Sequence, residues 1–290
     1  MTLQFTKMEG AGNDYVYVDC FRQDVALDAA AISFLSDRRF GVGGDGVIFI
    51  RPSDRADGFM DMYNLDGSAG KMCGNGVRCV GKYLWDHGYA RDPDAVTVDT
   101  RSGIKTLAMQ LGPDGRATGA AVEMGEAVLD CASIPVAFAG DSLEVPLRVD
   151  APDYTVDAVC TCVSMGNPHA VIFTEGIDAL DLEKIGPYYE NHPLFPDRVN
   201  TEFVERVGEN ELRMRVWERG SGETLACGTG ACAAGVAAVR RGLCATGAPI
   251  RIHLRGGDLI VTYRADGTVV MQGPATEVFT GEIELKSQVQ

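Results

Sequence analysis

The pattern Cys-Gly-x-Gly occurs twice in this chain, at Cys73 and at Cys227, 154 positions apart. Further landmarks recur at the same spacing: Gly12-Asn13 and Gly166-Asn167, Asn64 and Glu218, and Gly88 and Gly242. Glycine turns can recur by chance among 35 glycines, but four landmarks in one register favour an internal repeat. A period of this length predicts two domains of one design rather than a solenoid.

Both cysteines stand where a helix is predicted to begin. After Cys73, apolar residues recur at helical spacing, and after Cys227 the segment is small and apolar; a glycine ends each segment. Two more helices are predicted, over 28–39 with Asp28 as N-cap and over 178–191. Alternating or apolar segments predict strands over 3–8, 16–19, 47–50, 59–64, 95–100, 104–111, 117–125, 143–149, 154–166, 169–174, 201–208, 211–220, 249–256, 258–265 and 268–285.

Composition and charge narrow the class of protein. Apolar residues make up 46% and charged residues 23% of the 290 residues, as in soluble globular domains. The formal charge of −15 argues against nucleic acid or an anionic membrane as the main partner. No apolar run reaches the length of a membrane span, and the N-terminal segment does not resemble a signal peptide. We therefore expect a cytoplasmic protein.

The nine cysteines bear on redox state and on metal binding. An odd count without a secretion signal favours reduced thiols. No histidine stands near a cysteine pair at ligand spacing, so a metal site is not expected. Cys79 and Cys232 lie inside the two helices that follow the repeated motif, and we expect them to fill the core rather than to react.

A cysteine that precedes glycines at a helix N-terminus has a defined chemistry. The unpaired N–H groups favour an anion, lower the pKa of the thiol and let a carboxylate approach the backbone. Two such ends at one small molecule supply a thiolate base and a thiol acid together. Removing a proton from one face of a carbon and returning one to the other face inverts that stereocentre. No lysine suited to pyridoxal is evident, so no cofactor is expected.

Five segments resemble the motif set of the diaminopimelate epimerase family: EGAGNDY, NLDGSAGKMCGNGVRC, SMGNPHAV, RVNTEF and WERGSGETLACGTGACAA. The joint occurrence of MCGNG and ERGxGETxACGTG separates the chain from proline racemase and hydroxyproline epimerase relatives. The resemblance implies an α/β (α+β) fold of two pseudo-symmetric domains, each a mixed, mainly antiparallel, barrel-like sheet around a central helix. The first domain is expected to comprise 1–121 with 275–290 and to carry Cys73, and the second to comprise 122–274 and to carry Cys227.

The resemblance further implies an isomerase that converts LL-2,6-diaminopimelate to the meso form without pyridoxal phosphate, for lysine and peptidoglycan-precursor synthesis. It implies a homodimer whose loops close over the substrate. Cys73 and Cys227 would be the acid–base pair, with His169 and Glu218 beside the sulfurs. The residues implied in substrate binding are Asn13, Asn64, Gly74, Asn75, Asn167, Asn200, Glu218, Arg219, Gly228 and Thr229.

Several of these residues have a plain structural alternative. His169 follows a proline and could satisfy backbone groups at the start of a strand. Asn13 and Asn167 could be turn residues that tolerate left-handed backbone, although their equivalence in the repeat favours binding. Asn200 lies in a predicted loop, where a turn role is equally physical. Glu218 and its arginine neighbour could be a solvated charge pair, but their place before the glycine loop favours the site.

The segment GVGGDG at 41–46 fits the dinucleotide-binding pattern GxGxxG. That fingerprint follows a strand and opens a helix, whereas this segment follows a predicted helix and opens a predicted strand, so nucleotide binding is rejected. Some members of the family carry glutamine in place of Gly46, and many have a more acidic loop where this chain has Gly70-Lys71. Both departures could alter loop closure or affinity.

Two other functions stay open. A racemase of another amino acid on the same scaffold would keep both cysteines and change the residues that read the distal end of the substrate. A thiol-redox or ligand-binding protein would instead form a disulfide between two reactive cysteines. Oxidation would be the function of a redox protein, whereas it would abolish turnover by an epimerase.

Overall fold

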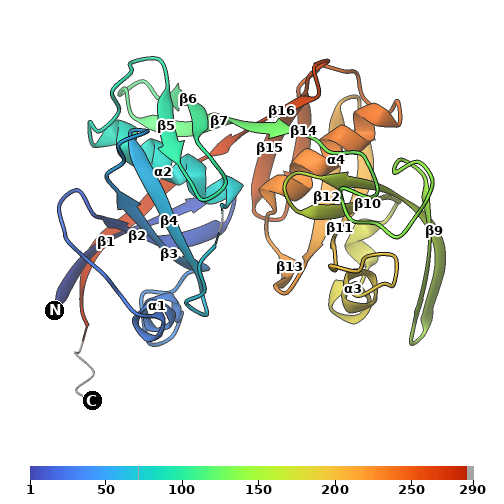
Figure 1. Ribbon diagram of the computed structural model, residues 1–290, viewed down its shortest axis with the longest axis horizontal. Coiled ribbons are helices and arrows are strands. Elements are labelled where there is room, and N and C mark those ends of the chain that lie inside the picture. Colours follow the sequence, from blue (N-terminus) through green and yellow to red (C-terminus); the bar gives the residue numbers. More distant parts are fainter. Residues whose placement is uncertain (71, 286–290) are drawn as a thin grey trace. The chain divides into compact units, whose positions relative to one another are not determined.

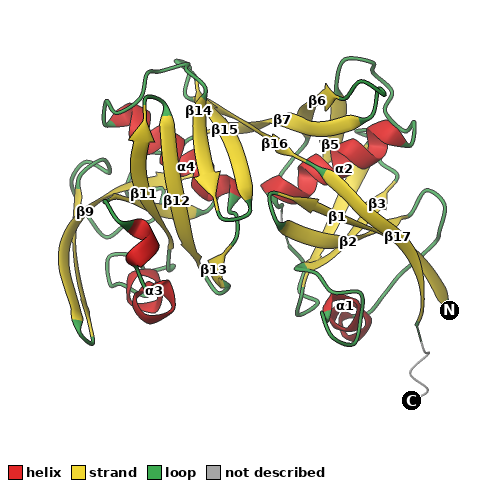
Figure 2. Cartoon of the chain, turned by 180° about the vertical axis from the view of Figure 1, so that it is seen from behind, coloured by secondary structure: helices red, strands yellow, loops and turns green. Residues whose placement is uncertain are grey.

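The computed structural model describes residues 1–70 and 72–285. The chain divides into two compact units (Figures 1 and 2). The first unit comprises Met1–Val122 and the chain from Gly273 onward, and the second comprises Glu123–Gln272. The boundaries fall inside two strands, β7 (Ala117–Glu126) and β16 (Thr268–Pro274).

The first unit is a mixed sheet with two helices, α1 (Ala29–Ser36) and α2 (Gly74–Asp86). Its other strands are β1 (Thr2–Gly10), β2 (Asn13–Asp19), β3 (Gly46–Arg51), β4 (Gly58–Asn64), β5 (Val96–Asp99), β6 (Lys105–Leu111) and β17 (Thr276–Glu284). Hydrogen bonding follows the order β17-β1-β2-β3-β4-β5-β6-β7. The β2–β3 and β4–β5 pairs are parallel and the others are antiparallel.

The second unit repeats this plan with α3 (Leu182–Glu190), α4 (Gly228–Arg240) and a short 3₁₀ helix, η1 (Ile177–Ala179). Its strands are β8 (Val145–Ala151), β9 (Tyr154–Ser164), β10 (Pro168–Phe173), β11 (Asn200–Gly208), β12 (Glu211–Glu218), β13 (Gly222–Thr224), β14 (Ile250–Leu254), β15 (Gly257–Tyr263) and β16. The order is β8-β9-β10-β11-β12-β14-β15-β16, and β13 also pairs with β12. Here the β10–β11 and β12–β14 pairs are parallel.

The sequence repeat is present in the strand register. Val16 pairs with Val47 between β2 and β3, and adding 154 to both numbers gives Ala170 and Thr201, which pair between β10 and β11. The next three strand pairs keep the same offset. The predicted duplication therefore holds at the level of individual backbone pairs.

In each unit a glycine lets the central helix approach its sheet closely. A Cβ on Gly81 of α2 would lie 2.6 Å from Leu107 Cδ2, and a Cβ on Gly235 of α4 would lie 2.7 Å from Val261 Cγ1. The four residues match in pairs under the 154-residue offset. Most of each helix is buried, and α4 is built largely of small residues. The enclosed helix predicted for each unit is therefore observed, with a glycine at the closest approach of helix and sheet.

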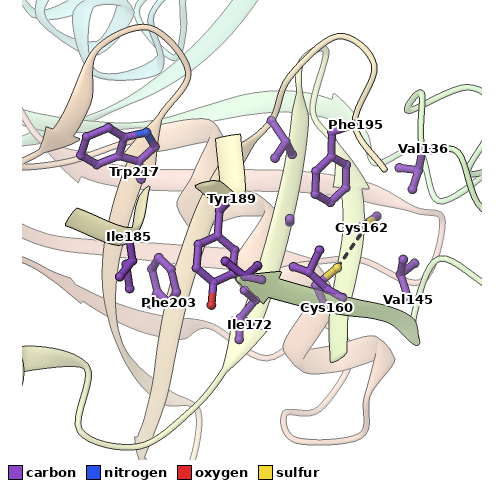
Figure 3. Packing of buried hydrophobic residues seen from close by; sticks show 14 of the residues in the cluster. Val136, Val145, Cys160, Cys162, Ile172, Ile185, Tyr189, Phe195, Phe203 and Trp217 are labelled. Atoms are coloured by element: carbon purple, nitrogen blue, oxygen red, sulfur yellow. Dashed lines mark hydrogen bonds between the residues drawn. The ribbon is translucent and has the colours of Figure 1, made fainter. Parts of the chain in front are cut away.

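Aromatic packing anchors the strands that carry the polar residues of the second unit (Figure 3). The rings of Tyr189 on α3 and Phe203 on β11 meet edge to face, with centroids 5.1 Å apart. The Trp217 indole on β12 packs in the same cluster, and its Nε1 donates a hydrogen bond to Glu190 at 2.8 Å. This packing fixes the end of β12 immediately before Glu218.

Most predicted elements are confirmed, with differences at some ends. Asp28 caps α1 as predicted, and its carboxylate accepts from the Ala31 amide at 2.8 Å. The helix predicted from 178 begins only after Asp181, whose carboxylate caps α3 and separates it from η1. The tail predicted as one run breaks at Ala275, and its second part, β17, pairs with β1. No helix in the described part of the chain is long and apolar enough to cross a membrane.

Candidate active site

Cys73 and Cys227 occupy the N-cap positions of α2 and α4, as predicted. Each sulfur accepts a hydrogen bond from the amide of the third helical residue, at 3.4 Å from Gly76 and 3.3 Å from Gly230. Both cysteines have extended backbone, as expected of a capping residue. The amides of each first helical turn therefore point to the same end as the sulfur, where negative charge is stabilised.

In the first unit, Asn13 contacts the sulfur of Cys73. The thiol donates to Asn13 Oδ1 at 3.2 Å, and Asn13 Nδ2 donates to Asp45 Oδ2 at 2.7 Å. A carboxylate only accepts hydrogen bonds, so Asp45 fixes the orientation of the Asn13 amide. The Arg38 guanidinium lies 2.9 Å from Asp45 and holds that carboxylate in turn.

Two cations bind the carboxylate of Asp14, the residue that follows Asn13. Lys7 and Arg38 each lie 2.6 Å from the Asp14 carboxylate. Burial opposes the charge of Asp14, but hydrogen bonds from Arg38 and Lys7 outweigh burial and hold its pKa below the usual range. Burial and the neighbouring charge of Asp14 raise the pKa of Asp45.

The other predicted residues of the first unit lie at the end of β4 and the start of α2. Asn64 Nδ2 donates to Ser68 Oγ at 3.0 Å, while Asn75 follows Gly74 in the first helical turn and is buried. Gly46, opposite Asn64 in the sheet, has no room for a side chain, because a Cβ would lie 2.1 Å from a backbone oxygen. This explains why glycine stands there. Lys71 lies outside the described residues.

In the second unit, a line of hydrogen bonds leads from Cys227 into the core. The Cys227 sulfur lies 3.5 Å from Thr229 Oγ1, which accepts from Asn167 Nδ2 at 3.4 Å. Asn167 Oδ1 lies 3.1 Å from Nε2 of His169, whose Nδ1 lies 2.7 Å from Glu202 Oε1. The predicted residues Asn167, His169 and Thr229 thus form one connected group.

Glu218, which is half-buried, lies close to the buried thiol of Cys227. Thr224 donates to Glu218 Oε1 at 2.5 Å. Burial raises the pKa of Glu218, against hydrogen bonds from Thr224 and Cys227. Burial also raises the pKa of Cys227 well above its usual value, and the charges of Glu218 and Glu202 add to this effect. The hydrogen bond from the Gly230 amide at the helix N-terminus lowers the pKa of Cys227, as expected, but burial and the two carboxylates outweigh it.

Asn200 and Arg219 are joined to each other rather than lying in a free loop. Asn200 begins β11 and is buried, which corrects the prediction of a loop residue. Its Nδ2 donates to the Pro168 oxygen at 3.0 Å, and its Oδ1 accepts from the Arg219 amide at 2.9 Å. The Arg219 guanidinium donates to the Asp197 carbonyl oxygen at 2.8 Å.

Sequence reasoning missed Asp45 and Glu202. Asp45 belongs to the glycine segment that we rejected as a nucleotide site; that segment indeed follows α1 and opens β3. Glu202 is the one charged residue within the run Asn200–Val204 of β11, but the burial of that run is evident only in the structure. Across residues 1–70 and 72–285, no three His, Cys, Asp or Glu side chains gather as a metal site.

These features define a class of protein with duplicated α/β domains, each presenting a cysteine at the N-terminus of an enclosed helix. A family model described as diaminopimelate epimerase matches residues 5–129 and 161–278. The chain is 49% identical to a diaminopimelate epimerase of Leptospira biflexa, covering 98% of this chain and 100% of that protein. It is 48% identical to one of Acetivibrio thermocellus, covering 98% and 99%. The chain belongs to the diaminopimelate epimerase family and is an enzyme of the isomerase class.

Solved structures with low sequence identity share the fold. A hydroxyproline epimerase from Agrobacterium vitis superposes with a TM-score of 0.69 at 15% identity, covering 99% of this chain and 92% of that chain. A methylitaconate-delta-isomerase superposes with a TM-score of 0.62 at 17% identity, covering 100% and 99%. The predicted fold class, two barrel-like α/β domains, is confirmed.

Proposed function

We propose that this enzyme converts LL-2,6-diaminopimelate to meso-2,6-diaminopimelate without a cofactor, with Cys73 and Cys227 as the acid–base pair. The observation that carries the proposal is the matched pair of cysteine N-caps, each with its sulfur bonded to the third helical amide. Membership of the family supports the choice of substrate. It also supports lysine and peptidoglycan-precursor synthesis, a cytoplasmic location and a homodimer.

In this mechanism one sulfur is a thiolate and the other a thiol. The thiolate takes the α-proton, so the carbon–hydrogen bond breaks and its electron pair spreads onto the adjacent carboxylate. The thiol then gives its proton to the opposite face of the same carbon, and a new carbon–hydrogen bond forms. One proton is taken and one is returned, so the balance is kept and the stereocentre is inverted. The roles of the two sulfurs exchange with the direction of reaction.

The amides that follow each cysteine are suited to the charge that develops in this step. Gly74 and Asn75 open α2, and Gly228 and Thr229 open α4, so their N–H groups lie in the first turns, where no helical carbonyl accepts them. A carboxylate bound there gains hydrogen bonds that strengthen as negative charge builds up. The same amides stabilise whichever cysteine sulfur is the thiolate.

The remaining predicted residues would hold the polar ends of the substrate. Glu218 is half-buried beside Cys227 and is suited to an ammonium group, whose positive charge would also offset the repulsion that keeps Cys227 protonated. Arg219 is suited to the distal carboxylate through its forked N–H groups. Asn13, Asn64, Asn167 and Asn200 supply amide groups, and His169 supports the cysteines.

The test is proton NMR in D2O with reduced protein and LL-diaminopimelate. We expect enzyme-dependent loss of the α-proton signal and appearance of meso product, and both should be lost in Cys73→Ala and Cys227→Ala. Cys20→Ala is the matched control, since Cys20 is a half-buried cysteine of the first unit outside the site. No exchange by folded, reduced wild-type protein would sink the assignment.

The same assay separates the two alternatives. Exchange with another amino acid, and none with diaminopimelate, would identify a racemase of that amino acid. Absence of α-proton exchange with every amino acid of a panel, together with reversible formation of a Cys73–Cys227 disulfide, would favour a thiol-redox or binding protein.

A further inference from the structure

The internal repeat relates two core positions of opposite chemistry, Ile48 on β3 and Glu202 on β11, which are 154 residues apart. Both side chains are fully buried, and both lie beneath the capped helix. A Cβ on Gly76 would lie 2.9 Å from Ile48 Cδ1, and a Cβ on Gly230 would lie 2.6 Å from Glu202 Oε1. The sister position shows that an aliphatic side chain suits this place, so packing does not require the carboxylate.

A buried carboxylate at position 202 lowers the stability of the fold, so its presence calls for a functional reason. Glu202 is 0% exposed, and within the described residues its Oε2 has no hydrogen-bond partner. A buried charge with unused hydrogen-bonding capacity costs stability, whereas an apolar residue of similar size does not. Its Oε1 makes one short contact, with Nδ1 of His169 at 2.7 Å.

The partners of His169 determine where its protons lie. A carboxylate only accepts hydrogen bonds, so with Glu202 ionised His169 Nδ1 is the donor of that bond. Asn167 Nδ2 faces Thr229 Oγ1, which leaves Asn167 Oδ1 facing His169 Nε2 at 3.1 Å. An amide oxygen also only accepts, so Nε2 donates as well. Both contacts of the ring are satisfied together when each nitrogen carries a proton, that is, when the His169 ring is an imidazolium that faces a Glu202 carboxylate.

We propose that Glu202 is a positioning residue that holds His169 as an imidazolium and, through Asn167, aims the Thr229 hydroxyl at the sulfur of Cys227. Thr229 Oγ1 accepts from Asn167, so its own hydrogen is free to donate to the sulfur, 3.5 Å away. That bond favours the thiolate of Cys227 when it forms, and the positive charge on His169 offsets the Glu202 charge that otherwise raises the pKa of Cys227. Glu202 thus acts through three other side chains and touches no reacting atom.

The equivalent asparagine of the first unit is oriented differently. Asn13 is held by Asp45, which comes from the loop before β3, and it turns its oxygen toward Cys73. The position equivalent to His169 is occupied by Tyr15. The line from Glu202 to Thr229 therefore belongs to the second unit and makes the surroundings of the two cysteines unequal.

The first test reads protons directly and does not depend on activity. Nitrogen-15 NMR of histidine-labelled protein, with His169→Gln used for assignment, should show two protonated ring nitrogens on His169. In Glu202→Gln, which keeps the shape and removes the charge, and in Glu202→Ile, which copies the sister domain, one ring nitrogen should lose its proton. A neutral His169 in the wild-type protein would overturn the proposal.

The second test is kinetic and rests on the proposed function. We expect the kcat for diaminopimelate epimerisation to fall about tenfold in E202Q and up to about a hundredfold in E202I, with KM nearly unchanged. The control is Asp57→Asn, which alters a buried carboxylate that bonds to backbone amides in the first unit. D57N should lose stability without loss of kcat in the folded protein.

Unchanged kcat in E202I would overturn the proposal. If the wild-type protein does not act on diaminopimelate, the proposed function fails while the NMR test of Glu202 still stands. The two failures are therefore distinguishable.

Discussion

Replacing Gly230 by alanine tests whether Glu202 is held where the structure places it. Gly230 is the third residue of α4, and a Cβ there would lie 2.6 Å from Glu202 Oε1 and 3.3 Å from Cys227 Cβ. Real Cβ atoms essentially never approach another heavy atom closer than 3.0 Å. Either the carboxylate must recede from His169, or the capped end of the helix must move.

The expected magnitude is a balance of two effects. Alanine in place of glycine favours the helix by up to about 1 kcal/mol. Disturbing the charged hydrogen bond between His169 and Glu202 costs about 1.5–3 kcal/mol. The loss wins, and the variant should be less stable by about 1–2 kcal/mol. For a unit of this size that corresponds to a fall in Tm of about 3–6 °C.

The repeat supplies a matched control in Gly76→Ala. The added Cβ would lie 2.9 Å from Ile48 Cδ1 and from Met60 Cε, which are the ends of flexible side chains. These can rotate away, so the gain in helix propensity offsets the crowding and the net change should stay within about 1 kcal/mol. Thermal unfolding by calorimetry and kcat from α-proton exchange should be measured for both variants. Equal Tm and equal kcat in the two variants would refute the reasoning.

Three further predictions concern single groups. Asp45→Asn should release the orientation of the Asn13 side-chain amide and lower kcat about tenfold in the exchange assay. An unchanged kcat would show that the Asp45 carboxylate does not fix that orientation. Because its pKa is raised, Cys227 should resist iodoacetamide at pH 8 and react faster as the pH rises, and Glu218→Gln, which removes a repelling charge, should speed alkylation at a given pH, as read by mass spectrometry; no acceleration would contradict this cause. Hydrogen bonds to Glu211, which contributes most, and to Asp258 raise the pKa of His253. The stabilisation by these bonds is therefore full below about pH 6.5 and is lost as the pH rises through the pKa of His253 in the folded protein. In urea unfolding, His253→Gln should therefore cost more at pH 6 than at pH 9, by less than about 1 kcal/mol, and an equal cost would count against the pairing.

The parts of the fold that sequence predicted are those with local signals. The stops after α2 and α4 were readable because Gly88 and Gly242 take positive φ, which glycine adopts without strain. The capping cysteines were readable because glycines follow them at the start of an apolar helical segment. The duplication was readable because both copies kept those signals at one spacing.

The parts that sequence did not predict depend on burial and on side-chain direction. A strand covered on both faces loses its alternation, so nothing local showed that Glu202 points beneath α4. Asp45 was hidden because its task is to orient Asn13, 32 residues earlier in the chain. The raised pKa of Cys227 follows from its surroundings, which no local pattern reports. Asn200 was taken for a loop residue because its partner Arg219 lies in the turn after the neighbouring strand β12.

The repeat also separates the features that are present in both units from those that are present in only one. The cysteine cap, its glycines and the asparagine beside it are kept in both units, as expected if each sulfur must be able to take or give a proton. The surrounding positions have diverged: Tyr15, Ile48, Asn64 and Leu65 of the first unit correspond to His169, Glu202, Glu218 and Arg219 of the second. A substrate with one reacting carbon and one distal arm requires equivalent proton chemistry on its two faces but unequal recognition around them. Under the proposed function, Glu218 and Arg219 would recognise polar groups of the substrate from one copy only, whereas His169 and Glu202 would serve Cys227.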